Sequence, residues 1–143
     1  MHQTIINRVF SEFQRWSGDR ASLEEQTYNS SDLSPETVAQ TLGPIKGYDD
    51  QFRKVFGTGV TSDSVIKAIA AYMRTIVSGN SAYDRFQAGD KTALSQAAQR
   101  GMALFNTKAR CATCHRGFNF TDEAYHNTGL GFDKQSPDFG RYR

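Results

Sequence analysis

The chain has 143 residues, a length that suits one domain with a real core and makes two full domains unusual. Its 17 basic and 15 acidic side chains are mixed along the sequence and give a formal charge of +2, so no basic block predicts nucleic-acid binding. The longest apolar run is too short to span a membrane.

The first pattern in the chain is an apolar stripe at helical spacing in residues 4–16. Its members are Ile5, Ile6, Val9, Phe10, Phe13 and Trp16. Periodicity alone favours a helix whose stripe packs into a core. Turn-forming residues follow at 17–20, and Ser22 with Glu25 then gives the capping-box pattern of a second, short helix.

Five later segments combine helical apolar spacing with capping or terminating residues. They begin at Ser34, Tyr48, Thr61, Ser81 and Ser95. The expected ends are Gly43, Gly57, Gly79 and Gly89, and the last segment runs through Phe105. No strand signal, repeat or low-complexity tract accompanies them. The sequence therefore predicts an all-α fold.

The most specific motif is Cys111-Ala112-Thr113-Cys114-His115, the Cys-x-x-Cys-His pattern to which c-type haem is attached. Positions i, i+3 and i+4 of one helical turn share a face. Both sulfurs can therefore reach the two vinyl groups of one porphyrin, while the imidazole of His115 reaches its iron from the same side. We expect one covalent haem c here, bound by Cys111, Cys114 and His115, with His115 as the iron ligand.

Three other interpretations of the motif remain open. A redox-active dithiol is typical of a βαβ setting, and no alternating strand run precedes Cys111. Structural zinc requires four ligands, which Cys111, Cys114, His115 and His126 could supply. The pentapeptide could also be a chance occurrence in a surface loop. Because the motif uses both cysteines of the chain, none is left for a structural disulfide.

Several further residues are candidates for secondary roles. Met73 could be an axial sulfur ligand, but a methionine in an apolar stripe is more often core filler. Arg116 could pair with a haem propionate or face water. His126 could be a second axial ligand or a zinc ligand, although a lone histidine in a polar loop usually has neither role. Gly101 inside a helix costs about 1 kcal/mol against alanine, which indicates close approach by another helix or by the haem plane.

Covalent haem attachment to this motif takes place outside the bacterial cytoplasm in known families, which predicts a periplasmic location. The residues from Met1 to Thr4 nevertheless lack the basic and apolar segments of a signal peptide. We therefore expect either a processed or cut piece of an exported protein, or a chain that carries no haem as made.

Four segments resemble bacterial dihaem cytochrome c peroxidases and the related dihaem proteins that mature methylamine dehydrogenase. They are YDDQFRKVFG at 48–57, AIAAYMRT at 68–75, SGNSAYDRF at 78–86 and RGMALF at 100–105. The sequence HNTGL at 126–130 fits the same group. Residues 5–10, Trp16 and residues 22–26 resemble the stretch that links the two haem domains of these proteins. The resemblance covers nearly the whole chain, with the motifs in the same order.

The resemblance implies a cytochrome c-like helical haem domain at residues 48–143, C-terminally incomplete, and a linking segment at 1–47. The family carries two c-type haems. The peroxidatic haem reduces hydrogen peroxide to water, and the other accepts electrons from a small donor, a cytochrome c or a cupredoxin. The motif at 111–115 corresponds to the electron-accepting haem. Trp16 corresponds to the family's tryptophan between the haems, an electron relay, which replaces the core-packing interpretation of that residue.

The chain also departs from the family pattern. It has one Cys-x-x-Cys-His motif, so the peroxidatic haem is expected to lie outside it. Residues 27–31 stand where the family's Asn-Pro-x-Glu-Met segment supplies the catalytic glutamate, and no glutamate can be carried over. The segment with the distal ligand of this haem, and most ligands of the interdomain calcium, are also expected outside the chain.

The sequence thus predicts the electron-accepting part of a dihaem cytochrome c peroxidase. Alone it is expected to be a poor peroxidase, because it lacks the second haem and the acid–base glutamate. The alternative is a stand-alone monohaem electron carrier without catalysis, which needs an internal sixth ligand such as Met102 or His126. A third interpretation is a haem-free helical domain with an exposed apolar surface, which we expect to form a homodimer or to swap elements.

Overall fold

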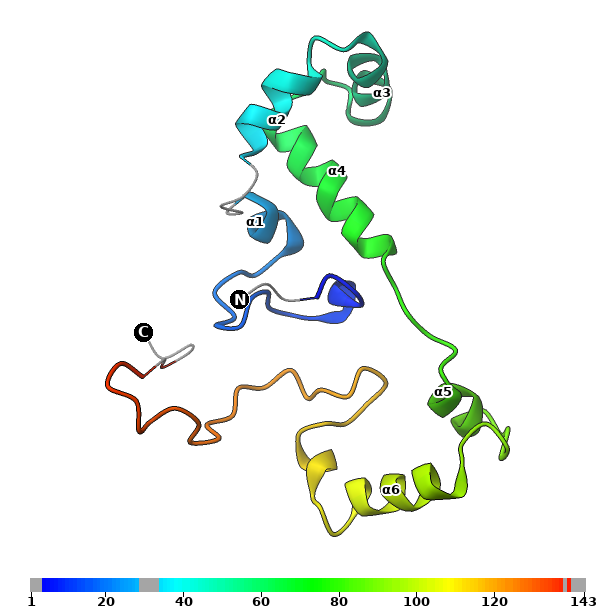
Figure 1. Cartoon of the computed structure of the whole chain (residues 1–143). Coiled ribbons are helices and arrows are strands. Elements are labelled where there is room, and N and C mark those ends of the chain that lie inside the picture. Colours follow the sequence, from blue (N-terminus) through cyan, green and yellow to red (C-terminus); the bar gives the residue numbers. More distant parts are fainter. Residues whose placement is uncertain (1–3, 29–33, 138, 140–143) are drawn as a thin grey trace. The chain divides into compact units, whose positions relative to one another are not determined.

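The computed structural model describes residues 4–28, 34–137 and 139, and these residues form a helical protein (Figure 1). The elements are η1 (Arg8–Phe10), α1 (Leu23–Tyr28), α2 (Pro35–Leu42), α3 (Lys46–Phe56), α4 (Ser62–Thr75), α5 (Ala82–Gln87), α6 (Gln96–Asn106) and η2 (Cys111–Thr113). Extended pairing among the described residues is limited to one antiparallel bridge, between Gln14 and Arg20. The predicted all-α fold class is confirmed.

The chain forms two compact units. The first comprises Met1–Val77 with Gly131–Arg143, and the second comprises Ser78–Leu130. The division into 1–47 and 48–143 comes from the family resemblance, whereas these two units are defined by contacts within the fold. That division therefore stays a prediction. Among the described helices, none has both the length and the apolar character needed to cross a bilayer.

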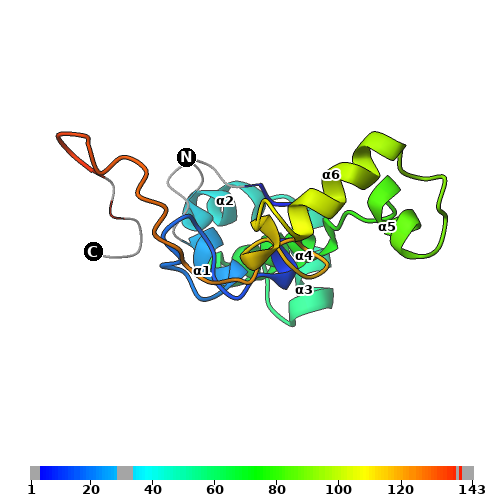
Figure 2. The same ribbon diagram turned by 90° about the horizontal axis from the view of Figure 1, so that it is seen from below.

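Helix α4 is the centre of the first unit, and both α1 and α2 lie against it (Figures 1 and 2). The cap predicted at Thr61 forms, and Ser64 completes a capping box with it. The Thr61 hydroxyl accepts a hydrogen bond from the Ser64 backbone N–H at 3.1 Å, and the Ser64 hydroxyl accepts one from the Thr61 N–H at 2.8 Å. Among the described residues of the unit, the buried apolar ones are Leu23, Pro35, Val65, Ile66 and Ala70. Three of these five belong to α4, so this helix supplies most of the described core.

An ion pair also joins α1 to α4. The Arg74 guanidinium donates to both carboxylate oxygens of Glu24, at 2.7 and 2.9 Å. Helix α1 begins as predicted, because the Ser22 hydroxyl accepts from the Glu25 N–H at 3.0 Å, while the Glu25 carboxylate accepts from the Ala21 N–H at 2.9 Å. The two helices are therefore fixed to each other by charge as well as by apolar packing.

The prediction of a helix over residues 4–16 is wrong. Only the 3₁₀ turn η1 forms there, and the side chains of Ile5, Ile6 and Phe10 are exposed. Asn7 lies in the left-handed region with φ 59°, and its N–H bonds to the carbonyl of Ile76 at 2.9 Å instead of to its own segment. A distant carbonyl thus replaces the helical ladder that periodicity predicted.

Buried Gln14 holds the rest of this N-terminal segment. Its backbone N–H donates to the Arg20 carbonyl at 2.8 Å, and its side chain both accepts from Arg8 Nε at 2.9 Å and donates to the Ser11 carbonyl at 3.2 Å. A buried amide needs such partners, because an unpaired polar group away from water is costly. The segment is therefore organised by polar contacts rather than by its apolar stripe.

The remaining predicted helices form close to their expected bounds. Helix α3 ends at Phe56 and is capped by Gly57, whose φ of 74° is the left-handed conformation that glycine adopts without strain. Helix α4 ends at Thr75 rather than at the predicted Gly79, because Ile76 leaves the helix and gives its carbonyl to Asn7. In the second unit, Ser81 caps α5 and Ser95 caps α6 through their hydroxyls.

Candidate functional site

The Cys-x-x-Cys-His motif follows α6 and forms one tight turn. The 3₁₀ turn η2 spans Cys111–Thr113, with the Cys114 N–H bonded to the Cys111 carbonyl at 3.2 Å. The His115 N–H bonds to the same carbonyl at 2.9 Å. Both thiols are free and half-buried. The local turn that the motif predicts is therefore present, and it places two sulfurs and one imidazole within a single turn of backbone.

The imidazole of His115 is oriented by the main chain. Its Nδ1 lies 3.1 Å from the carbonyl oxygen of Phe120, and the residue is exposed. A carbonyl can only accept, so Nδ1 carries a proton, and in the neutral ring Nε2 then keeps its lone pair. A backbone carbonyl on one ring nitrogen is a common way to fix the tautomer of a metal-binding histidine. In that tautomer, Nε2 is the nitrogen of His115 that could bind a metal.

Aromatic rings from three elements lie around this imidazole. The ring centroids of Phe105, on α6, and His115 are 6.4 Å apart, and Phe105 meets Phe120 edge-on at 6.1 Å. Tyr83, on α5, lies 5.0 Å from Phe120. These separations are within the range at which aromatic rings attract one another. The rings give the surroundings of His115 an apolar character.

No residue of the second unit is buried as a whole, although all of its residues, 78 to 130, are described. Its exposed large apolar residues are Leu104, Phe118, Phe120, Tyr125 and Leu130. A side chain built on Gly101 would meet no atom within 4 Å, and Leu104 and Phe105 share its face of α6. The close neighbour that Gly101 predicted is therefore not another part of the described chain. A flat apolar cofactor beside α6 and the motif fits this surface.

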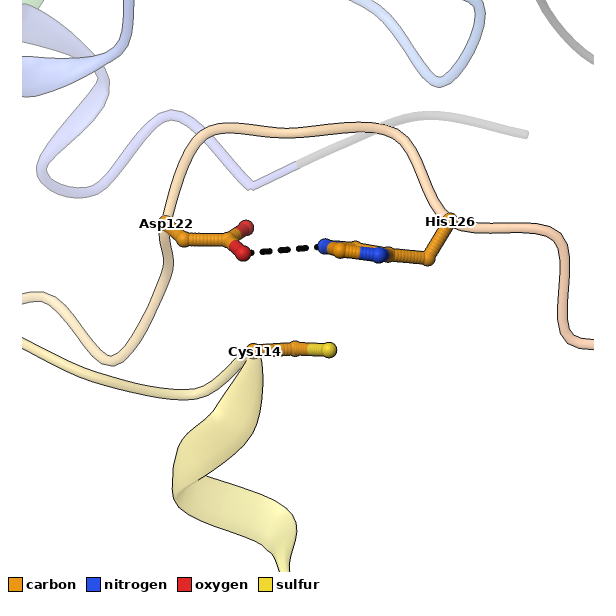
Figure 3. Close-up of side chains that lie close together, drawn as sticks. All are labelled: Cys114, Asp122 and His126. Carbon is orange, nitrogen blue, oxygen red and sulfur yellow. Dashed lines mark hydrogen bonds and ion pairs between the residues drawn. The ribbon is translucent and has the colours of Figure 1, made fainter.

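A second group of side chains meets at Cys114. The Nε2 atom of His126 lies 2.9 Å from Oδ2 of Asp122, and the ligand atoms of Cys114, Asp122 and His126 all lie within 4.8 Å of one another (Figure 3). The other carboxylate oxygen of Asp122 accepts from the Ala124 N–H at 3.0 Å. That N–H, and then the hydrogen bond with His126, hold the pKa of Asp122 below its usual range.

This group differs from the four zinc ligands expected from the sequence. Of those four, the structure brings Cys114 and His126 together, and the third member of the group is Asp122 rather than Cys111 or His115. Sequence reasoning missed Asp122. The only signal for it was an acid four residues before a histidine in the loop that follows the motif.

The other candidate ligands have different surroundings. Met102, on α6, is half-buried, and its sulfur accepts a long hydrogen bond from Gln87 Nε2 at 3.8 Å. Met73 is half-buried on α4, in the first unit. Arg116 is exposed, and its charge contributes to lowering the pKa of Asp122. No observation assigns any of these three side chains to an iron ion.

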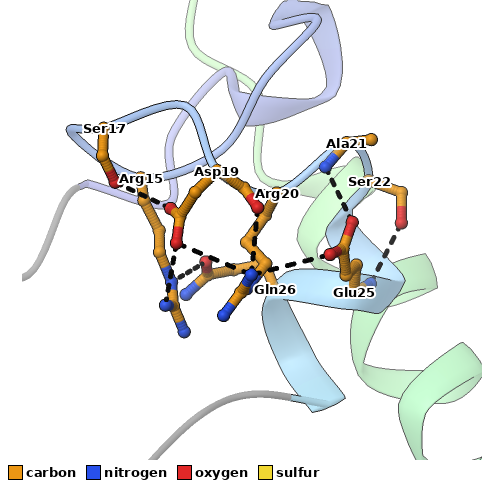
Figure 4. Close-up of polar contacts among 8 residues, drawn as sticks. All are labelled: Arg15, Ser17, Asp19, Arg20, Ala21, Ser22, Glu25 and Gln26. Atoms are coloured by element: carbon orange, nitrogen blue, oxygen red, sulfur yellow. Dashed lines mark hydrogen bonds and ion pairs between the residues drawn. The ribbon is translucent and has the colours of Figure 1, made fainter. Parts of the chain in front are cut away.

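Trp16 lies at the tip of a loop in the first unit, and its residue surface is 68% exposed. Figure 4 shows the polar contacts that hold this loop. The Ser17 hydroxyl donates to Asp19 at 2.7 Å, and Arg15 Nε donates to the Gln26 side chain at 2.8 Å. The Ser17 hydrogen bond is the main cause that lowers the pKa of Asp19. The loop is thus tied to α1 while its indole faces outward.

Comparison with known proteins gives a consistent result. The family model described as di-haem cytochrome c peroxidase matches residues 1–92. The chain is 35% identical, over 96% of its length, to the methylamine utilization protein MauG of Methylorubrum extorquens. It is 37% identical over 98% of its length to the cytochrome-c peroxidase IdrP1 of Pseudomonas sp. strain SCT, and 38% identical over 89% to the cytochrome c551 peroxidase of Pseudomonas aeruginosa. The chain spans 40%, 38% and 39% of these three relatives, respectively.

Proposed function

The chain belongs to the di-haem cytochrome c peroxidase family, and from this premise we propose that it is an electron-transfer module that holds one c-type haem through Cys111, Cys114 and His115. The alignments with relatives at 96% and 98% of the chain extend over this motif, although the family model ends at residue 92. The proposal concerns this chain's part in a larger protein, because the chain spans about two fifths of those relatives.

The observation that carries the proposal is the orientation of His115. Its Nδ1 faces the Phe120 carbonyl at 3.1 Å, which leaves the Nε2 lone pair for iron. The two thiols stand on the same turn of backbone and are free to form thioethers. In each thioether, the sulfur bonds to one vinyl carbon and the thiol hydrogen passes to the other, so no further reactant is needed.

Haem bound here supplies reversible one-electron chemistry at its iron. The protein's contribution would be to bind the haem, to orient it and to shield it from water. Cys111 and Cys114 would hold the haem, His115 would bind its iron, and the Phe120 carbonyl would keep the ring proton of His115 at Nδ1. The rings of Phe105 and Phe120 would give one border of the haem an apolar character, and the polarity around a haem is one of the factors that set its reduction potential.

Within the complete protein, we assign this module the electron-accepting role. Electrons would come from a small periplasmic donor, a cytochrome c or a cupredoxin, and would leave for the centre that reduces hydrogen peroxide. Trp16 is the candidate relay toward that centre, and its exposed indole supports this assignment. The names of two relatives, cytochrome c551 peroxidase and cytochrome-c peroxidase, support the reaction class. A periplasmic location and calcium in the complete protein are part of the same proposal.

The test is to produce the chain with a bacterial cytochrome c maturation system and to measure its mass and spectrum. We expect a mass increase of one haem and a Soret band, and we expect the double variant C111S/C114S to lack both after denaturation. The spin state then distinguishes an open iron position from a closed, monohaem electron carrier. An unmodified mass in the presence of an active maturation system would contradict the proposal.

A further inference from the structure

Cys114 belongs to two arrangements at once, because it is part of the haem motif and also faces Asp122 and His126 (Figure 3). We propose that, before haem is attached, Cys114, Asp122 and His126 bind one zinc-class divalent ion with water as the fourth ligand, and that this ion withholds Cys114 from haem attachment. The second half of this inference rests on the proposed function, whereas the metal site itself does not.

The separations of the three side chains suit a small tetrahedral ion. Their ligand atoms lie within 4.8 Å of one another, and His126 Nε2 is 2.9 Å from Asp122 Oδ2. Zinc bond lengths imply ligand–ligand separations of about 3.3–3.8 Å in a tetrahedral site. The longest separation must therefore shorten by about 1 Å and the hydrogen-bonded one must open slightly. Both changes are small for side chains in a loop and at the end of a turn.

The chemistry of the three ligands selects the class of ion. A thiolate, an imidazole and a carboxylate form the mixed set that zinc and cobalt accept, whereas magnesium and calcium prefer oxygen ligands alone. Binding deprotonates the coordinating thiol. The charges of Cys114 and Asp122 then balance those of a divalent ion, and His126 joins as a neutral ligand. The resulting site is neutral overall, which limits the cost of placing charge beside apolar residues.

Asp122 is already held in the orientation that this site requires. The Ala124 N–H takes one carboxylate oxygen at 3.0 Å and leaves the other, Oδ2, facing His126. Only 9% of the Asp122 side-chain surface is exposed, so the carboxylate is shielded from water on most sides. A carboxylate fixed in this way loses little conformational freedom when it binds an ion.

Metal binding and haem attachment compete for one sulfur. Attachment joins the Cys114 sulfur to a vinyl carbon and moves its hydrogen to the neighbouring carbon. A zinc-bound sulfur has lost that hydrogen to solvent and shares its lone pair with the metal. Cys111 stands outside the metal group, so the ion would leave one of the two attachment points available and block the other. The maturing chain would therefore need to release the ion before both thioethers form.

Cobalt(II) is the probe for the site, because its thiolate complexes absorb strongly in the near ultraviolet and its tetrahedral complexes in the visible. We would titrate cobalt into the full, reduced, haem-free chain. We expect both bands in the wild type, and we expect C114S and H126A to raise the dissociation constant at least tenfold, since even outer-shell partners of bound metals contribute about 10- to 100-fold. D122N should act in the same direction.

C111S and H115A are the matched controls, because each removes the same type of ligand from outside the group. Both should keep the cobalt bands and the wild-type affinity. Circular dichroism would show that each variant retains its helices. Equal loss of binding in C111S and C114S, or in H115A and H126A, would overturn the proposed ligand set. It would favour instead the four zinc ligands that the sequence predicts. No cobalt bands in a folded wild type would also overturn the proposed set.

The competition is measured separately, by incubating reduced haem with the haem-free chain and following covalent attachment by mass. We expect one equivalent of zinc to slow formation of the doubly attached product in the wild type and to slow it much less in H126A. Equal rates in the wild type with and without zinc would overturn the block. A zinc-free chain that attaches no haem even with an active maturation system would contradict the proposed function instead, and the cobalt titration would decide the metal site independently.

Discussion

The Nδ1 atom of His115 lies 3.1 Å from the carbonyl oxygen of Phe120, so a main-chain group fixes which ring nitrogen is available for a metal. This carbonyl belongs to the main chain, so no substitution at Phe120 removes it. The neighbouring rings of Phe105 and Phe120 add an apolar border to the same imidazole. The role of this arrangement is therefore tested by changing the histidine.

Replacing His115 with glycine removes the proposed iron ligand and keeps both cysteines. We expect the haem-loaded H115G chain to change its absorption spectrum when imidazole is added, because the free ligand fills the position that the side chain occupied. The haem-loaded H126A chain is the control and should behave as the wild type. An H115G spectrum that is identical to the wild type and insensitive to imidazole would place the iron ligand elsewhere.

The ion pair between Glu24 and Arg74 should stabilise the first unit modestly. Both oxygens of Glu24 are engaged, which favours the upper part of the range of about 0.2–1 kcal/mol measured for partly exposed pairs. We expect a double-mutant cycle with E24A and R74A, followed by urea unfolding, to give a coupling in this range. The more exposed pair of Asp63 and Lys67, within α4, should give a smaller coupling and serves as the control.

The capping box of α4 should be among the most sensitive polar features of the first unit. Removing the Thr61 hydroxyl in T61A leaves the Ser64 N–H without its partner and is expected to lower the free energy of unfolding by about 1 kcal/mol. T61S keeps the hydroxyl and should restore most of that stability. Urea unfolding of the two variants measures the difference, and equal values for them would contradict the capping role.

Acid should weaken the loop around Asp122. Its pKa is lowered in the folded chain, first by the Ala124 N–H and then by His126. Ionised Asp122 therefore stabilises the folded loop fully above the pKa of the unfolded chain, about 3.9. This stabilisation is lost as the pH falls through the lower pKa of the folded chain. We expect D122N to abolish this loss and H126A to diminish it only in part. Amide hydrogen exchange in the loop, measured across this pH range, would detect the loss of stability. A pH profile of D122N equal to that of the wild type would contradict the prediction.

Trp16 should matter for electron transfer and not for folding. Its residue surface is 68% exposed, so W16F is expected to change the free energy of unfolding by less than about 0.5 kcal/mol. L23A, which truncates a side chain that is 4% exposed, should cost about 2–5 kcal/mol and shows the contrast. In the complete protein, W16F should slow electron transfer between the haems in stopped-flow measurements. A rate equal to that of the wild type would remove Trp16 from the pathway.

Local signals were sufficient to predict most of the helices. The hydroxyls of Ser22, Thr61, Ser81 and Ser95 cap the helices that the sequence assigned to them. In each case, the residues that decide the structure lie within one turn of each other. Such interactions can be inferred from a single stretch of sequence.

The failures concern partners that lie far apart in the chain or have no distinctive spacing. The helix expected over residues 4–16 is absent because Asn7 bonds to Ile76 and Arg8 bonds to buried Gln14, and periodicity carries no information about either contact. The haem motif was recognised from its spacing. Asp122 was not, because an aspartate in a polar loop resembles many others until the fold places it beside His126.

The helices of residues 78–130 have well-formed caps, yet none of the residues in that range, all of which are described, is buried. In an ordinary domain, the side chains of the chain itself form the hydrophobic core. Here, on the proposed function, the prosthetic group would become that core, and loading would be the last step of folding rather than an addition to a finished protein. Limited proteolysis would then report maturation, and the supply of haem would set how long a newly made chain survives.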